Sequence, residues 1–224
     1  MSLFGEVRVV EDVAQQYATI VHERLAASSA DAFLLATSGS GSGSAAQHAL
    51  GARPDVDLSR IALYYIDERC VDLDSDQRNA NTIKNALGPR YHEFRWVHEM
   101  SCPDGPQAYA ELLQAAGPFD VIQLGLGPDG HTASIFPGPL APGVQGGPLV
   151  IRNNDPSGTN LHDRLTWTYP ALDAARLAIF TVAGPDKVDA ISRIAAGEDL
   201  PAARVRSNEV IWLLDTAAAQ GLFR

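Results

Sequence analysis

Short, fully apolar segments alternate with amphipathic segments along most of the chain. Continuous apolar runs of this length predict strands that are buried on both faces of a sheet. We expect such strands at 32–37, 61–66, 120–124, 177–183 and 209–214. Strands of this kind, separated by helices, are typical of a parallel sheet with helices on both faces.

Helical spacing of apolar residues predicts the elements between these strands. In the first helix, apolar residues recur at roughly helical intervals from Val9 to Leu25. The polar segment 67–87 runs from a loop into another helix. Further helices are expected at 45–50, near 106–116 and near 186–196.

Two segments resemble domain linkers in composition but are expected to lie within one domain. The run SGSGSGS at 38–44 lies between a predicted strand and a predicted helix, which favours a loop over a flexible linker. The segment 137–160 is rich in proline and glycine, but strands are expected after it. We therefore predict a single α/β domain over residues 1–224.

Composition and charge narrow the classes of partner. Hydrophobic residues make up 46% of the chain and charged residues 20%, as in ordinary globular proteins. A formal net charge of −10 without a basic cluster disfavours nucleic acid and anionic membranes as partners. No apolar run approaches the roughly 18 residues of a membrane span, and the acidic N-terminal segment is unlike a signal peptide. We expect a cytoplasmic protein that is a monomer or a weak homodimer.

Cysteines and histidines show no pattern typical of a metal site. Cys70 and Cys102 are too few for a disulfide framework and form no CxxC pair, so we expect both to be reduced. The histidines have no metal-ligand spacing, and no HExxH motif occurs. The sequence therefore predicts no metal site.

The segment GLGPDGH, residues 125–131, directly follows a predicted strand. Its glycines match the GxGxxG pattern of dinucleotide-binding turns. Such a unit needs a full helix and a second strand, however, and here a proline-rich segment begins at Pro137. A turn that needs glycine for its backbone geometry alone explains the glycines better. The histidine that ends the segment has chemistry of its own.

His131 is predicted to be a general base. We expect it near the N-terminus of a helix, where the positive end of the helix dipole disfavours the imidazolium form. A neutral imidazole accepts a proton from water, and Asp129 could orient the ring. Because His131 lies among several polar loops at the carboxyl ends of strands, catalysis is favoured over a structural role.

Other polar segments also follow predicted strands. Arg69 leaves a strand beside two acids, and its guanidinium either binds a phosphate or carboxylate or forms an ion pair within a solvated loop. The run 38–44 offers hydroxyl and backbone N–H groups to a phosphate but lacks the Lys-Ser/Thr ending of a P-loop. Lys187 lies in the first turn of a predicted helix, where a bound phosphate or Asp186 would offset its charge.

Taken together, four segments resemble the 6-phosphogluconolactonases of the pentose phosphate pathway. They read VIQLGLGPDGHTASIFPG, IDERCVDLDSDQRNA with Asn79, RLTWTYPALDAARLAIFTVAGPDK and PAARVRSNEVIWLLD. The resemblance runs from about residue 35 to residue 216. It implies a Rossmann-like fold of the sugar-phosphate isomerase/deaminase type. It also implies hydrolysis of 6-phospho-D-glucono-1,5-lactone without a cofactor.

The resemblance also implies roles for individual residues. His131 would be the general base, with Asp129 beside it. The ligand would be a small sugar-phosphate lactone, bound by Arg69, Lys187, Asp67, Ser38, Gly39, Ser40, Gly130 and Thr132.

The chain departs from this family's pattern in two places, and two alternatives stay open. The first loop reads TSGSGSGS where the family has Ser-Gly-Gly-Ser/Thr or Thr-Gly-Gly-Gly, and Asp173 replaces an asparagine. Aminosugar-phosphate deaminases carry a stretch like Ile-Ala-Phe-Asn-Glu-Pro after the histidine, which HTASIFPG lacks. Sugar-phosphate sensors normally carry a DNA-binding helix pair before this domain, but only about 30 residues precede the first predicted strand, and they are predicted to form one helix. The lactonase is favoured over both.

Overall fold

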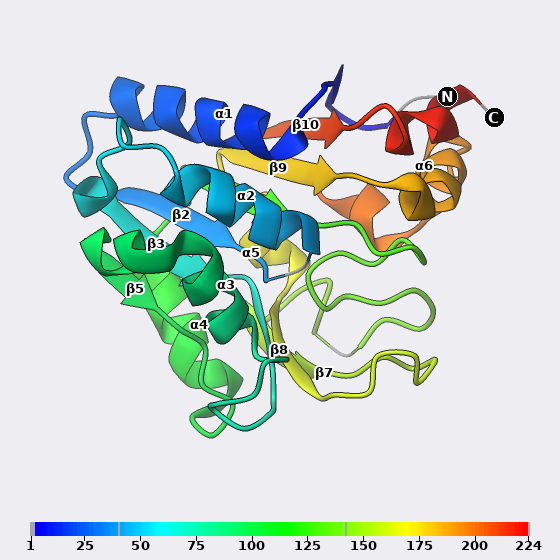
Figure 1. The fold of residues 1–224 in the computed structure, drawn as a ribbon. Helices are drawn as coiled ribbons and strands as arrows, with labels where there is room; N and C mark the ends of the chain where they lie inside the picture. Colours follow the sequence, from blue (N-terminus) through cyan, green and yellow to red (C-terminus); the bar gives the residue numbers. More distant parts are fainter. Residues whose placement is uncertain (1–2, 40, 142, 224) are drawn as a thin grey trace.

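A parallel sheet forms the centre of the computed structural model, which describes residues 3–39, 41–141 and 143–223 (Figure 1). Within these residues the sheet has seven strands, in the order β1-β10-β9-β6-β2-β3-β5. They are β1 (Glu6–Val9), β10 (Glu209–Leu214), β9 (Leu177–Val182), β6 (Val121–Leu124), β2 (Phe33–Thr37), β3 (Ile61–Tyr65) and β5 (Trp96–His98).

The five strands predicted from apolar runs are confirmed as the inner strands of this sheet. Strand β9, for example, is buried at every position, as a strand covered on both faces must be. The edge strands β1 and β5 were not predicted. Each is only three or four residues long and mixes half-buried with exposed side chains, so neither gives a continuous apolar run.

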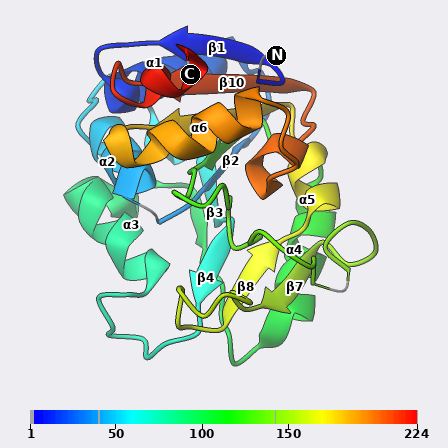
Figure 2. The ribbon, with the colours of Figure 1, turned by 90° about the vertical axis from the view of Figure 1, so that its right-hand side faces the viewer.

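Helices cover both faces of the sheet. Figure 2 looks onto the carboxyl ends of the strands, with α1 (Val13–Ala27), α2 (Gly41–Gly51) and α3 (Asn79–Leu87) on one side. On the other side lie α4 (Gly105–Ala116) and α5 (Tyr169–Asp173), while α6 (Val188–Ala195) lies across the carboxyl ends. No helix of the described residues is long and apolar enough to cross a membrane. The predicted α/β fold with helices on both faces is confirmed.

The predicted helix boundaries are wrong at two N-termini. Helix α1 begins after Asp12, whose Oδ1 accepts hydrogen bonds from the N–H groups of Ala14 and Gln15, so Val9 belongs to β1. Helix α2 begins at Gly41, so the second half of the glycine–serine run is its first turn rather than a loop.

A small antiparallel sheet, ordered β4-β8-β7, adjoins the main one and was not predicted. It consists of β4 (Asp67–Arg69), β8 (Arg164–Trp167) and β7 (Val150–Asn153). The expectation that Asp67–Arg69 form a loop is therefore wrong, and the proline- and glycine-rich segment 137–160 contains a strand, β7. Short 3-10 helices complete the described chain, at Leu58–Arg60, Gly88–Glu93, Pro185–Lys187, Pro201–Arg204 and Ala218–Phe223.

A buried glutamine joins the carboxyl ends of the central strands. Gln123 of β6 is fully buried, and its Oε1 accepts hydrogen bonds from Thr37 Oγ1 (2.9 Å) and from the backbone N–H of Ser38 (3.0 Å). Its Nε2 donates to Thr181 Oγ1 of β9 at 2.9 Å. These bonds fix the ends of β2, β6 and β9 relative to one another, and with them the loops that follow.

Cys70 and Cys102 form a disulfide, so the expectation that both are reduced is wrong. Cys70 follows β4 and Cys102 precedes α4, and their Cα atoms lie 5.4 Å apart. The two cysteines are 32 residues apart in the sequence, and nothing in that spacing shows that the fold brings them together. Arg152 of β7 donates one hydrogen bond to Cys70 Sγ and another to the Cys102 carbonyl.

Candidate active site

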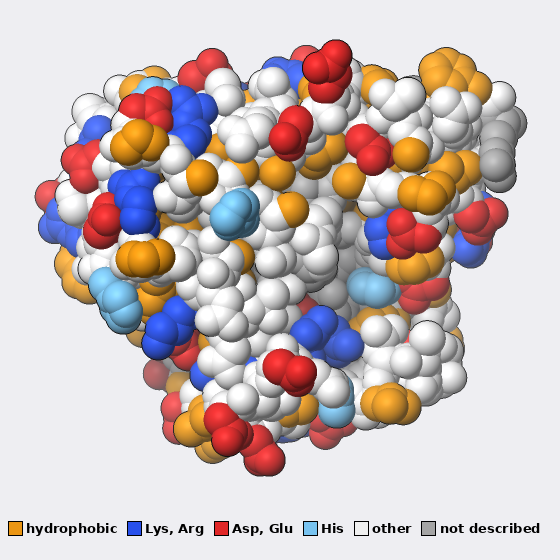
Figure 3. Space-filling model, in the orientation of Figure 1, with side chains coloured by type: hydrophobic (Ala, Val, Ile, Leu, Met, Phe, Trp, Pro, Cys, Tyr) orange, Lys and Arg blue, Asp and Glu red, His pale blue; other side chains and the backbone are white. Residues whose placement is uncertain are grey.

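A cavity of about 550 Å³ opens at the carboxyl edge of the main sheet. Figure 3 shows this face hollowed, with histidine and Lys or Arg side chains beside the hollow. The loops after β2, β6 and β9 contribute to the lining, together with β4, β8 and the starts of α2 and α3. Of the predicted site residues, the cavity brings together Ser38, Asp67, Arg69, His131 and Lys187. Segments far apart in the sequence therefore meet at one place, as the parallel sheet requires.

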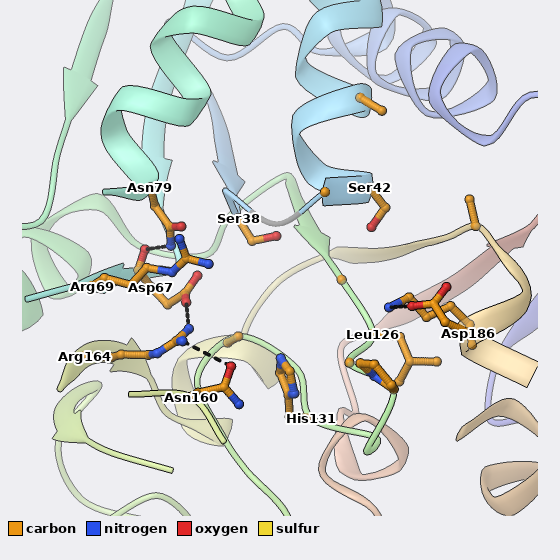
Figure 4. A pocket seen from close by; sticks show the side chains of 18 residues that line it. Ser38, Ser42, Asp67, Arg69, Asn79, Leu126, His131, Asn160, Arg164 and Asp186 are labelled. Carbon is orange, nitrogen blue, oxygen red and sulfur yellow. Dashed lines mark hydrogen bonds and ion pairs between the residues drawn. The ribbon is translucent and has the colours of Figure 1, made fainter. Parts of the chain in front are cut away.

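His131 faces the cavity from the loop after β6. In Figure 4 it lies across from Ser38, with Arg69 and Arg164 on one side and Asp186 on the other. Its Nδ1 lies 2.6 Å from Asp129 Oδ1, and the same carboxylate oxygen accepts the backbone N–H of His131 at 3.0 Å. Among the described residues none forms a hydrogen bond with Nε2, so this nitrogen is the one available to a ligand.

The Asp129 carboxylate is the charged partner of this imidazole. Burial raises its pKa, but the hydrogen bond and the charge of His131 outweigh burial, so the pKa of Asp129 is lowered overall. Asp129 is therefore ionised at neutral pH and can accept a proton carried by Nδ1. With the proton held on that side, Nε2 is left as an acceptor.

No helix begins at His131, so the predicted stabilisation of neutral imidazole by a helix dipole is wrong. Residues 125–140 form turns and a single β-bridge between Thr132 and Ile135. The ring is positioned instead by the tight turn itself, in which the His131 carbonyl accepts a hydrogen bond from Gly127 N–H at 2.8 Å. A Cβ atom on Gly127 would collide with the His131 ring and the Asp129 carboxylate.

Gly130 and Thr132 support the turn and do not line the cavity. Gly130 has a φ of +92° and packs against Leu200, so a side chain there would be strained as well as crowded. Thr132 is buried, and its hydroxyl donates to the Gly125 carbonyl at 2.9 Å. The structure thus places both predicted substrate ligands behind the loop rather than at its surface.

Arg69 reaches the cavity from the end of β4. Its Nη1 donates to the Gln77 carbonyl at 2.7 Å, which holds the side chain in place. Its Nε is buried, and no described residue accepts its hydrogen. A bound anion would provide the missing acceptor, as expected for an arginine that binds phosphate or carboxylate.

Arg164 is a second cavity arginine, which was not predicted from the sequence. It lies on β8 opposite Arg69 and is 6% exposed. Its Nη1 lies 3.9 Å from Asp67 Oδ2, and its Nη2 donates to Asn160 Oδ1 at 3.3 Å. Burial lowers the pKa of Arg164, although Asp67 partly offsets this effect. The one available signal was its place at the start of RLTWTYPALD, a segment that already resembles the lactonases.

Lys187 closes the opposite side of the cavity. It ends a short 3-10 helix just before α6, and its Nζ forms an ion pair with Asp186 at 2.7 Å. The neighbouring acid predicted to compensate for this lysine is therefore its partner in the structure. An anionic ligand at Lys187 would compete with Asp186 for the ammonium group.

The first loop is only partly described. Ser38 lines the cavity, whereas Gly39 packs against Asn79, to which an added Cβ would come within 2.6 Å. Ser40, also predicted to bind substrate, lies outside the described residues. Gly41 and Ser42, the first residues of α2, line the cavity as well, so backbone N–H groups of a helix N-terminus face it.

The acids of β4 support the site from beneath. Asp67 accepts a hydrogen bond from Ser134 Oγ at 2.7 Å and faces Arg164. Burial raises the pKa of Glu68 to about 7, against the opposing effect of the backbone N–H groups that it accepts. Among the described residues, no group of three or more His, Cys, Asp or Glu side chains is arranged to hold a metal ion.

Comparison with protein families and with characterised sequences matches this chain to the same family of proteins. The family model described as glucosamine-6-phosphate isomerases/6-phosphogluconolactonase matches residues 6–212. The 6-phosphogluconolactonase of Mycobacterium tuberculosis is 34% identical over 211 residues, which cover 84% of this chain and 85% of the relative. The 6-phosphogluconolactonase of Streptomyces coelicolor is 35% identical over 196 residues, with 77% and 74% covered.

Solved structures share the fold. The 6-phosphogluconolactonase of Thermotoga maritima superposes with a TM-score of 0.81 at 25% identity and covers 94% of this chain and 99% of that one. The 6-phosphogluconolactonase of Trypanosoma brucei gives a TM-score of 0.80 at 25% identity, with 99% and 100% covered. A monomeric glucosamine-6-phosphate deaminase, 16% identical, has the same fold with a TM-score of 0.79, covering 96% and 99%. By its sequence and its fold, this chain belongs to the glucosamine-6-phosphate isomerase/6-phosphogluconolactonase family.

Proposed function

We propose that this chain hydrolyses 6-phospho-D-glucono-1,5-lactone to 6-phospho-D-gluconate, the second step of the oxidative pentose phosphate pathway. The observation that carries the proposal is the Asp129–His131 pair in one cavity with Arg69, Arg164 and Lys187. An oriented imidazole suits ester hydrolysis, and the cations suit a phosphorylated substrate. The names of the relatives with 34–35% identity support the same reaction.

In this proposal His131 is the general base. Its Nε2 removes a proton from water as the water oxygen attacks the C1 carbonyl of the lactone. The bond between C1 and the ring oxygen then breaks, and the imidazolium returns the proton to that oxygen. Water is thereby split between a carboxyl group at C1 and a hydroxyl group at C5. Asp129 holds the ring and stabilises the imidazolium while it exists.

The cations position the substrate. The chain carries a net charge of −10, so an anionic ligand depends on positive charge concentrated in the cavity. Arg69 and Arg164 supply that charge from one side of the cavity and Lys187 from the opposite side. Binding of the phosphate, remote from C1, contributes energy that holds the lactone in position for attack.

Replacement of His131 tests the assignment most directly. In a His131→Asn variant, kcat should fall by roughly 10²–10⁴-fold, the usual contribution of a positioned base. Binding of 6-phosphogluconate, measured by calorimetry, and the thermal midpoint should stay close to those of the wild type. Lactone hydrolysis is followed by acid release and corrected for spontaneous ring opening. A folded His131→Asn protein with near-normal kcat would contradict the proposal.

Two other functions remain alternatives. An aminosugar-phosphate deaminase would release ammonia from glucosamine 6-phosphate, but the sequence HTASIFPG lacks the Asn-Glu that follows the histidine in that group. A sugar-phosphate sensor would bind the ligand without turning it over. Incubation with each substrate separates the cases, because ammonia release, lactone hydrolysis and binding alone are distinct outcomes.

We also propose that the reaction needs neither a metal nor a cofactor. The proposed mechanism uses water, an imidazole and cationic side chains alone. Hydrolysis should therefore be unaffected by a strong chelator at millimolar concentration. Activity that is lost on chelation and restored by added metal would contradict this part of the proposal.

Location and assembly are proposed on the same basis. The substrate is a charged metabolite that does not cross membranes unaided, which favours the cytoplasm. One chain supplies the proposed base His131 together with the cations Arg69, Arg164 and Lys187, so a monomer or a weak homodimer would be sufficient for activity. Analytical ultracentrifugation over a range of concentrations tests the assembly, and specific activity should not depend on concentration.

A further inference from the structure

Glu68 is a buried acid to which the proposed mechanism gives no role. It lies in the middle of β4, between the cavity residues Asp67 and Arg69, and is 1% exposed. Glu68 does not itself line the cavity. A buried carboxylate destabilises the fold unless its oxygens accept hydrogen bonds, so its hydrogen-bond partners indicate which groups it positions.

Both oxygens of Glu68 accept backbone hydrogen bonds. Oε1 accepts from the N–H groups of Arg69 at 2.7 Å and of Asn79 at 2.6 Å. Oε2 accepts from the N–H of Ala80 at 2.9 Å. One carboxylate thus connects a cavity arginine on β4 to the beginning of α3, more than ten residues further along the chain.

The start of α3 has no local substitute for this acceptor. Asn79 and Ala80 are its first residues, whose N–H groups have no partner within the helix. Arg78 precedes them and provides no side-chain cap. A carboxylate is favourable at such a helix end because it satisfies the donors and opposes the positive end of the dipole. Glu68 therefore caps α3 from a neighbouring strand.

The residues that Glu68 holds form one wall of the cavity. Asn79 donates from Nδ2 to the Asp67 carbonyl at 2.9 Å and packs against Gly39 of the first loop. Figure 4 shows Asn79, Asp67 and Arg69 side by side on this wall. A shift at the start of α3 would therefore displace Arg69 and the loop after β2.

Glu99 is a second acid that contacts Arg78, and it provides a matched control for Glu68. Arg78 lies between the two acids, with Nε 3.8 Å from Glu68 Oε2 and Nη2 2.9 Å from Glu99 Oε2. Glu99 also accepts the Tyr91 hydroxyl at 2.8 Å, but it forms no hydrogen bond or ion pair with Arg69 or Asn79 and does not line the cavity. Substituting Glu99 therefore changes charge beside Arg78 without changing the wall.

We propose that Glu68 is a positioning residue that fixes Arg69 and Asn79 in the geometry needed to bind substrate, without touching the substrate itself. The inference rests on the proposed function, because it takes Arg69 to be a ligand of the phosphorylated lactone. Its effect is on binding rather than on proton transfer at His131. The two kinetic constants should therefore respond differently to changes at Glu68.

The test compares Glu68→Gln with the control Glu99→Gln. Glutamine keeps the shape of the side chain, but it turns an N–H group toward the backbone donors in place of an acceptor. In Glu68→Gln we expect the KM for 6-phosphogluconolactone to rise roughly tenfold while kcat stays within about twofold, the pattern of displaced binding groups. Glu99→Gln should leave both constants within about twofold of the wild type.

A double-mutant cycle with Arg69→Ala asks whether the effect passes through Arg69. If it does, Glu68→Gln should change KM far less in the Arg69→Ala background than in the wild type. Glu68→Asp is the second variant. It keeps the charge near Arg78 but withdraws the oxygens from the backbone donors, and it should also raise KM.

The possible outcomes distinguish a failure of this inference from a failure of the proposed function. A wild type that hydrolyses no lactone contradicts the proposed function itself. If the wild type is active, an unchanged KM in folded Glu68→Gln, or effects that are additive with Arg69→Ala, contradict the positioning role alone. Equal changes in Glu68→Gln and Glu99→Gln contradict it too. Failure of both Glu68 variants to fold would make Glu68 a requirement of the whole fold and would overturn the inference as well.

Discussion

Asp129 Oδ1 accepts the backbone N–H of His131 and also lies 2.6 Å from Nδ1 of the same residue's ring. One carboxylate oxygen therefore fixes both the backbone and the imidazole of the proposed base. The ring also lies 5.2 Å from Phe136, centroid to centroid, which limits its rotation. This arrangement leaves Nε2 directed at the cavity in a single orientation.

Asp129→Asn should lower kcat by roughly 10- to 100-fold while changing KM little. The asparagine amide can adopt an orientation that donates to Nδ1, so the imidazole can lose the tautomer in which Nε2 is the acceptor. Misplacement of a reacting group by about 1 Å has an effect of this size. Steady-state kinetics measure the effect, with Asp163→Asn as the control because Asp163 does not line the cavity. A kcat equal to that of the wild type would show that the turn alone orients the ring.

Lys187→Ala should reduce selectivity for the phosphorylated lactone. We expect kcat/KM to fall roughly 10- to 100-fold for 6-phosphogluconolactone, since a charge-assisted hydrogen bond contributes about 1.5–3 kcal/mol. The value for unphosphorylated glucono-1,5-lactone should change much less. Lys84→Ala is the matched control, because Lys84 is the other lysine of the chain and lies on α3 against Tyr91. Parallel losses for both lactones would place the phosphate elsewhere.

Glu68 should make stability depend on pH in a definite direction. Burial raises its pKa from 4.5 to about 7 in the folded protein. Between these values the unfolded chain releases the Glu68 proton while the folded chain retains it, so the free energy of unfolding falls as pH rises. The advantage of the wild type over Glu68→Gln should thus be larger at pH 5 than at pH 8, by roughly 1–3 kcal/mol. Urea unfolding of both proteins at the two pH values measures this difference. A difference that is the same at pH 5 and pH 8 would mean that the carboxylate is ionised throughout this range and would contradict the prediction.

The Cys70–Cys102 bond should stabilise the fold by about 2–4 kcal/mol, because it closes a loop of intermediate length in the unfolded chain. Cys102→Ser removes the bond without altering the residue next to Arg69. Chemical unfolding should show the wild type losing this stability in reductant, whereas Cys102→Ser should not respond. Equal stability of the wild type with and without reductant would contradict the prediction.

The predictable part of the fold is the part buried on both faces. Strand β9 reads LAIFTV and β10 reads EVIWLL, and at least five of six positions in each are buried, so their patterns stand out in the sequence. Strand β8 begins with a buried arginine and β4 with buried acids, because Arg164 and Asp67 offset each other's charge across the small sheet. That compensation exists only in three dimensions, so no apolar run marks these strands.

The site was predictable to a similar degree. His131 stood out through its motif, but the cause of its orientation was misassigned, since a carboxylate and a turn replace the expected helix dipole. Arg164 was missed because, apart from its place in a lactonase-like segment, a single arginine at a strand end gives no signal until Asn160 and Asp67 are placed beside it. The disulfide was missed for the same reason, since two isolated cysteines carry no information about their distance.

The glycine at position 127 has a consequence for how this protein can vary. The His131 ring occupies the space that any side chain at position 127 would need. The hydrophobic core is a separate region, in which, for example, the Trp212 ring stacks 3.9 Å from the Phe180 ring. Damaging variants of this chain should therefore fall into two groups. Changes at Trp212 would lower the amount of folded protein in the cell, whereas changes at Gly127 would leave the protein abundant and folded but inactive. A screen that scores abundance and growth separately would place position 127 among the few sites where the two scores disagree.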